Sequence, residues 1–138
     1  MSLPVYYVDA FTNKLFSGNP AAVIFSDLND PDLMQKIAAE NNLSETAFVR
    51  KEDDSYLIRW FAPSCEIDLC GHATIASAFV YFNFIDKDAT SFCVFSKEHG
   101  RLEVNRENDT YILNFPADNL TTFNNLKQTE AAIGVNPI

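Results

Sequence analysis

Basic residues are few in this sequence of 138 residues, which has 10 Lys and Arg against 19 Asp and Glu. The formal net charge is −9 and the isoelectric point is near 4.5. A surface of this sign repels nucleic acid and anionic membranes, so neither is expected as a partner. A small anionic ligand is not excluded, because the field of a local site can oppose that of the whole molecule.

Cysteine and histidine are also scarce, with three and two copies. Cys65, Cys70 and Cys93 form no Cys-x-x-Cys pair, and any disulfide would leave one of them unpaired. The two histidines are far apart in the chain, so we expect no metal site. Reduced thiols in a cytoplasmic protein are the simplest account of this pattern.

Long apolar segments are missing as well. Residues 73–85 carry no Asp, Glu, Lys or Arg, but this stretch is too short to cross a bilayer. The first residues, Met1 to Pro4, show neither the basic nor the apolar part of a signal peptide. We therefore expect no membrane partner.

Apolar and aromatic residues are plentiful, at 47% and 13%, and suffice for the core of a single domain. Residues 72–84 are apolar nearly all round, which predicts a helix surrounded by protein at the centre of that domain. An amphipathic helix is expected over 31–41, capped by Asp30, and a short one over 127–133. Residues 63–68 are expected to form a loop that leads into the central helix.

Strand patterns lie before and after the central helix, and together they predict an α+β fold. The expected strands are residues 5–8, 21–25, 44–50, 56–61, 91–96, 100–105 and 110–115. Residues 1–117 are expected to form the domain. Residues 118–138 are expected to form a linker and the start of a further lobe that this chain does not contain.

The start of the central helix is a candidate anion site. No Asp, Ser, Thr or Asn immediately precedes Gly71, so the first backbone N–H groups lack a side-chain cap and can bind an anion. Gly71 would let a ligand approach the backbone closely. Cys70 beside this terminus is a candidate thiolate. The alternatives are a helix start satisfied by water or a loop, and a small buried cysteine.

Three further residues are candidates for chemistry. Glu45 begins an otherwise apolar strand, where partial burial would suit a carboxylate to proton transfer. His72, in the first helical turn, could donate to a substrate or shuttle a proton. Asn19 could bind a ligand through its amide. The alternatives are a surface or capping Glu45, a packed core His72 and a turn-forming Asn19.

Four segments together resemble the phenazine biosynthesis-like (PhzF-like) isomerase family, a branch of the diaminopimelate-epimerase fold. They are Val8-Asp9-Ala10-Phe11, Phe16 to Val23 around Gly18-Asn19-Pro20, Asn42 to Phe48 around Ser44-Glu45-Thr46, and Ile58 to Phe61 leading to Cys70-Gly71-His72-Ala73-Thr74. The resemblance implies a curved, mixed or antiparallel sheet wrapped around a central helix. It also implies that this chain is the first lobe of a fold whose substrate lies between two lobes.

The resemblance implies a role for each motif residue. Glu45 falls on the family's acid/base glutamate. Substrate contacts fall on Asn19, Ser44, Cys70, Gly71, His72 and Ala73, and the activity needs neither cofactor nor metal. The residue after Gly71 is His and not the Asn of the epimerases, so Cys70 is a weak candidate for a catalytic cysteine.

These observations lead to one main hypothesis and one alternative. The main hypothesis is a cofactor-independent isomerase lobe that moves a proton on a small carboxylated metabolite. The alternative is a non-catalytic small-molecule-binding or assembly lobe, because the family's second lobe is missing. In either case we expect a homo-oligomer, such as a homodimer, or a separate second lobe as the partner.

Overall fold

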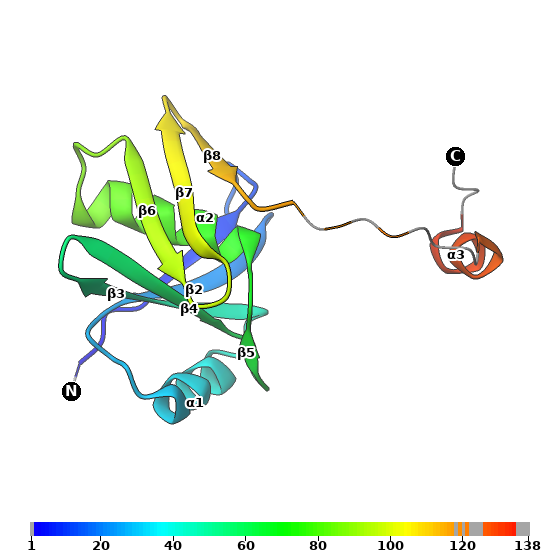
Figure 1. Ribbon diagram of the computed structural model, residues 1–138, viewed down its shortest axis with the longest axis horizontal. Coiled ribbons are helices and arrows are strands. Elements are labelled where there is room, and N and C mark those ends of the chain that lie inside the picture. The colour runs from blue at the N-terminus through cyan, green and yellow to red at the C-terminus, as the bar shows by residue number, and fades with distance from the viewer. Residues whose placement is uncertain (1, 118, 120, 122–125, 135–138) are drawn as a thin grey trace.

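The computed structural model describes residues 2–117, 119, 121 and 126–134, and its main body is one curled, mixed β-sheet (Figure 1). The strands follow the order β1-β2-β3-β4-β6-β7-β8, and β5 pairs with β4. Their bounds are β1 Tyr6–Ala10, β2 Asn19–Phe25, β3 Glu45–Glu52, β4 Ser55–Phe61, β5 Glu66–Ile67, β6 Ser91–Ser96, β7 Gly100–Glu107 and β8 Thr110–Asn114. The pairs β2–β3 and β4–β6 are parallel, since a helix separates the strands of each pair in the chain, and the others are antiparallel.

The helix α2, Gly71–Val80, runs along the inner face of this sheet and forms the centre of the larger core (Figure 1). Its buried side chains are small, which lets the strands approach closely. The hydroxyls of Thr74 and Ser77 donate hydrogen bonds of 2.6 and 2.7 Å to carbonyls one turn earlier, so they are satisfied inside the core. The expected α+β fold with a sheet around one central helix is confirmed.

The central helix changes its geometry near its end. The sequence predicts a helix to residue 84, whereas α-helical geometry ends at Val80 and Tyr81–Ile85 form a wider π-helical turn, η1. The N–H of Asp86 donates to the carbonyl of Tyr81 at 2.8 Å. The wider turn allows the adjacent rings of Tyr81 and Phe82 to pack on Phe92 of β6, at centroid distances of 4.5 and 6.5 Å.

The helix α1, Pro31–Asn41, covers the outer face of β2, β3 and β4, where Met34 and Ala38 form a smaller core with side chains of these strands. The carboxylate of Asp30 caps it as expected, accepting hydrogen bonds of 3.0 and 3.3 Å from the first turn. These strands are therefore covered on both faces by helices. This explains why residues 21–25 are a continuous apolar run without alternation.

The segment before α2 differs from its prediction. Residues 63–68 were expected to be a loop, but β5 forms there and places Ile67 opposite Trp60. The Glu66 carboxylate accepts two hydrogen bonds of 2.7 Å from the Arg59 guanidinium. This charge-assisted pair anchors the chain just before α2.

The last described helix is α3, Leu126–Ile133, which agrees with the short helix expected near the C-terminus and lies apart from the sheet (Figure 1). The linker expected from residue 118 onward lies largely outside the described residues. Within the described part of the chain, no helix has both the length and the apolar character that a membrane span requires.

Candidate functional site

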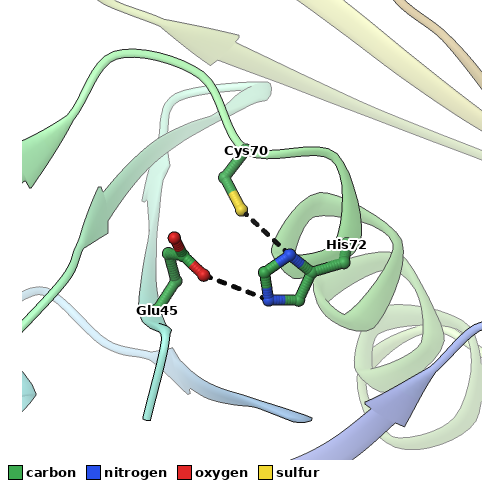
Figure 2. Close-up of side chains that lie close together, drawn as sticks. All are labelled: Glu45, Cys70 and His72. Carbon is green, nitrogen blue, oxygen red and sulfur yellow. Dashed lines mark hydrogen bonds and ion pairs between the residues drawn. The ribbon is translucent and has the colours of Figure 1, made fainter. Parts of the chain in front are cut away.

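Three side chains that could bind a ligand or transfer a proton meet at the start of α2: Glu45, Cys70 and His72 (Figure 2). Glu45 is the first residue of β3 and pairs with Ala21 of β2. Cys70 is the N-cap residue of α2, and His72 lies in the first turn of that helix. The parallel pairing of β2 with β3 and the packing of α2 on both strands bring these distant parts of the sequence together.

The imidazole of His72 lies between the other two groups (Figure 2). Its Nδ1 atom is 3.4 Å from the Cys70 sulfur, and its Nε2 atom is 3.2 Å from Oε2 of Glu45. The Ser44 hydroxyl is 3.3 Å from the same Nε2 atom. The four residues therefore form a continuous chain of polar contacts.

The carboxylate of Glu45 is largely buried, with 18% of its side chain exposed, as is His72 with 10%. The Oε2 atom has no hydrogen-bond partner among the described residues, because the nearby Nε2 of His72 is close enough for an ion pair but is not aligned for a hydrogen bond. A buried oxygen without a partner is costly in a purely structural role. Such an atom is available to a proton or to a ligand.

The environment of Cys70 agrees with the small buried cysteine, one of the two alternatives that the sequence left open. A helix N-terminus favours a thiolate, but burial raises the pKa of Cys70 from its ordinary 9.0 to about 11, and the nearby Glu45 charge acts in the same direction. The N–H groups of Ala73 and His72 oppose this shift, but they form no capping hydrogen bond with the sulfur. Cys70 is therefore a neutral thiol at physiological pH.

The remaining motif residues flank this centre. Asn19 is the exposed first residue of β2, two positions before Ala21, so it lies on the face of the sheet that carries α2. The side chain of Ala73 is fully buried, so only its backbone could reach a ligand.

The helix start itself has no side-chain cap, as the sequence predicted. The absence of a side chain at Gly71 also has a structural role, while the expected approach of a ligand there stays a prediction. A Cβ atom at Gly71 would lie 3.3 Å from the ring of Phe115, so its missing side chain makes room for that ring. No sequence motif marks Phe115, because the contact joins segments that are distant in the chain.

The donor set does not suit a single metal ion, although Glu45, Cys70 and His72 offer ligand atoms within 4.8 Å of one another in the described part of the chain. The two nitrogens of His72 face different partners, the sulfur on one side and the carboxylate on the other. An ion held by one nitrogen would lie away from one of these two groups. The arrangement fits a chain of proton donors and acceptors.

The family model described as phenazine biosynthesis-like protein (PhzC-PhzF) matches residues 8–134. The chain belongs to this family. It is 46% identical to an uncharacterized isomerase of Pseudomonas aeruginosa, over 100% of this chain and 53% of that protein. It is 45% identical to a phenazine biosynthesis-like domain-containing protein of Homo sapiens, over 84% of this chain and 43% of that protein.

Solved structures agree with this assignment. A PhzF family protein of Enterococcus faecalis superposes with a TM-score of 0.87 at 48% identity, over 97% of this chain and 52% of that one. A PhzC/PhzF protein of Clostridium difficile gives 0.83 at 46% identity, over 99% and 52%. The chain thus spans about half the length of the relatives it matches.

Proposed function

We propose that this chain is a lobe of a cofactor-independent isomerase that moves a proton on a small carboxylated metabolite, with Glu45 as the proton-transfer group. The observation that carries the proposal is the buried Oε2 atom of Glu45, which lacks a hydrogen-bond partner in the described chain and lies 3.2 Å from Nε2 of His72. Relatives named isomerases support the reaction class.

The chemistry follows from the groups at the site. The Glu45 carboxylate takes a proton from an acidic C–H bond, and the electron pair left behind is delocalised into the substrate. The uncapped N–H groups at the start of α2 bind the carboxylate of the substrate, and neighbouring donors stabilise the charge that develops. The protonated Glu45 then returns its proton to a different carbon, so the substrate is isomerised and no electrons are gained or lost.

A second candidate is a non-catalytic lobe that binds a small molecule or takes part in assembly. It is favoured by one observation, that the chain spans about half the length of its relatives. In this case the anion site at α2 would bind ligands without proton exchange. The two candidates therefore differ in whether a bound ligand exchanges hydrogen with solvent.

The test is Glu45→Gln, which keeps the size of the side chain but removes the base. Wild-type protein in D₂O is incubated with a panel of small carboxylic acids that carry an acidic C–H bond, and loss of C–H signals is followed by NMR. We expect exchange with wild type and a fall of about 10²–10⁴-fold in the variant. Glu40→Gln, an exposed change on α1, is the matched control and should exchange at the wild-type rate. Binding without exchange in wild type would favour the second candidate, and equal exchange in Glu45→Gln would contradict the assignment.

A further inference from the structure

The polar contacts at the start of α2 determine where the proton of His72 lies. A neutral imidazole has one N–H, and the partners of its two nitrogens decide which nitrogen carries it. Nδ1 faces the Cys70 sulfur at 3.4 Å, whereas Nε2 faces Glu45 Oε2 at 3.2 Å and the Ser44 hydroxyl at 3.3 Å. The groups on the two sides of the ring therefore determine separately whether the adjacent nitrogen carries the proton or a lone pair.

On the Nε2 side both neighbours carry oxygen atoms that can accept a hydrogen bond. Glu45 as a carboxylate has acceptor atoms only. The Ser44 hydroxyl donates to the carbonyl of Pro20 at 3.4 Å, which leaves its oxygen free to accept. An N–H on Nε2 can donate to the Ser44 oxygen and brings its positive end close to the carboxylate, whereas a lone pair there would be repelled by the carboxylate charge.

On the Nδ1 side the neighbour is a donor. Cys70 is buried, and that burial keeps its sulfur protonated at neutral pH. An S–H group directed at Nδ1 requires a lone pair on that nitrogen, which agrees with the demand on the other side of the ring. Both sides select the same tautomer.

We propose that Cys70 is a positioning residue whose S–H donates to Nδ1 of His72 and thereby holds the imidazole N–H on Nε2, where it is directed at Ser44 and lies beside the Glu45 carboxylate. Cys70 acts through His72 and does not itself exchange a proton with the substrate. The role rests on the proposed function, since it matters to catalysis only if Glu45 transfers a proton. The hydrogen bond from Cys70 keeps the lone pair of the imidazole on Nδ1, so that no lone pair on Nε2 faces the Glu45 carboxylate.

The tautomer can be measured directly by long-range ¹H–¹⁵N correlation spectra of the ¹⁵N-labelled chain at about pH 8, above the ordinary histidine pKa. We expect widely separated shifts for the two nitrogens of His72, with the proton on Nε2. The exposed His99 is the internal reference and should show averaged shifts. A proton on Nδ1 in wild type would overturn the proposal, and this test needs no variant.

Two substitutions test the role of the thiol. Cys70→Ala removes the donor and should bring the two His72 nitrogen shifts closer together, whereas Cys70→Ser keeps an O–H donor and should retain their separation. Cys65→Ala, at an exposed thiol, should leave them unchanged. Amide spectra check that each variant is folded. Identical His72 shifts in wild type and Cys70→Ala would refute the assignment.

The exchange assay then separates this proposal from the function on which it rests. In Cys70→Ala the exchange rate should fall by about 10- to 100-fold with a smaller change in apparent affinity, because the base and its neighbour lose their alignment. Cys70→Ser should recover most of the rate. If wild type shows no exchange but the His72 shifts respond to Cys70→Ala as expected, the proposed function fails, while the assignment of the His72 tautomer to Cys70 stands.

Discussion

Among single residues, Cys70 has two opposing influences on its acidity. Its place at the N-cap of α2 favours the charged thiolate, while burial in the surrounding core disfavours it, and desolvation is the larger effect. The same balance applies to any ionisable side chain at a helix start that faces inward. The position of a cysteine in a motif is therefore not enough to predict its reactivity.

The raised pKa of Cys70 makes stability depend on pH. In the unfolded chain this thiol ionises near 9.0, but in the folded chain near 11, so between these values the unfolded state loses its proton first. The free energy of unfolding should therefore fall as pH rises from 9 to 11. We expect this residue to contribute a loss of about 1–2 kcal/mol, since one pKa unit corresponds to about 1.4 kcal/mol and the thiol is not completely shielded.

Urea unfolding of wild type and Cys70→Ala at several pH values measures this effect. The stability difference between them should change by that amount across the alkaline range, while groups common to both proteins cancel. Cys65→Ala, at an exposed thiol, should parallel wild type. A constant difference between wild type and Cys70→Ala would show that Cys70 titrates alike in both states.

The sequence singled out part of this group of side chains and not the rest. Glu45 and His72 stand in short motifs, so they could be named as candidates, and the structure brings them within 3.2 Å of each other. The contacts of Nε2 with Ser44 and of Gly71 with Phe115 depend on how β3, α2 and the chain after β8 pack. No local pattern contains that information.

At the level of secondary structure, the connection between β1 and β2 is held in an unusual backbone conformation. Phe11 and Phe16 have positive φ angles of 64° and 62°, which are uncommon for bulky residues. The N–H of Phe16 donates to the Asp9 carboxylate at 2.8 Å. A Cβ atom at Gly18 would lie 2.3 Å from the carbonyl oxygen of Ala10, so only glycine fits there.

Gly18→Ala should therefore displace the start of β2 and with it Asn19. We expect a loss of about 3 kcal/mol, at the upper end of the cost of overpacking, because the contact is with backbone that cannot rotate away. Chemical denaturation measures the loss, and amide shifts of Asn19 and Glu45 should move with it.

Gly100→Ala is the matched control for this change. It also removes a glycine, here with a φ of +66°, but its Cβ meets open space. It should cost about 1 kcal/mol through backbone strain and leave the site's amide shifts unchanged. Equal shift changes in the two variants would mean that the close approach at Gly18 does not position the site.

The strands and helices themselves were predicted well, and the exceptions have physical causes. β5 has two residues, too few for any alternation to be visible in the sequence. The π turn η1 lies in a segment that is apolar nearly all round, so a change in helical period left no trace in the pattern. The boundaries of α1 were accurate because Asp30 and Pro31 mark its start.

For the molecule as a whole, the connection between β1 and β2 also presents large apolar side chains. Phe11, Leu15 and Phe16 are 71%, 81% and 94% exposed. Exposed apolar groups gathered on one loop are typical of a surface that another protein covers. We therefore expect the chain to self-associate or to bind a separate second lobe.

Sedimentation at high micromolar concentration tests this expectation. Wild type should sediment as an oligomer, and Leu15→Ser combined with Phe16→Ser should shift it towards the monomer, because the apolar area is lost. Ile112→Ser, at an exposed position on β8, is the control for a loss of surface hydrophobicity elsewhere. If the chain stays monomeric at all concentrations and does not bind an added second-lobe protein, the expectation is contradicted.

The sheet order has a further consequence for cooperativity. β4 and β6 share a single register pair, Leu57 with Phe95, whereas each adjacent antiparallel pair along the main path of the sheet has five or more. The half-sheet of β1 to β5 and the half-sheet of β6 to β8 therefore share little backbone pairing. They are held together mainly by the side chains that both pack against α2. Local opening along this seam should leave each half-sheet intact as its own exchange unit. Because α2 carries His72 at its first turn, we expect any relative movement of the two half-sheets to alter the geometry of the site.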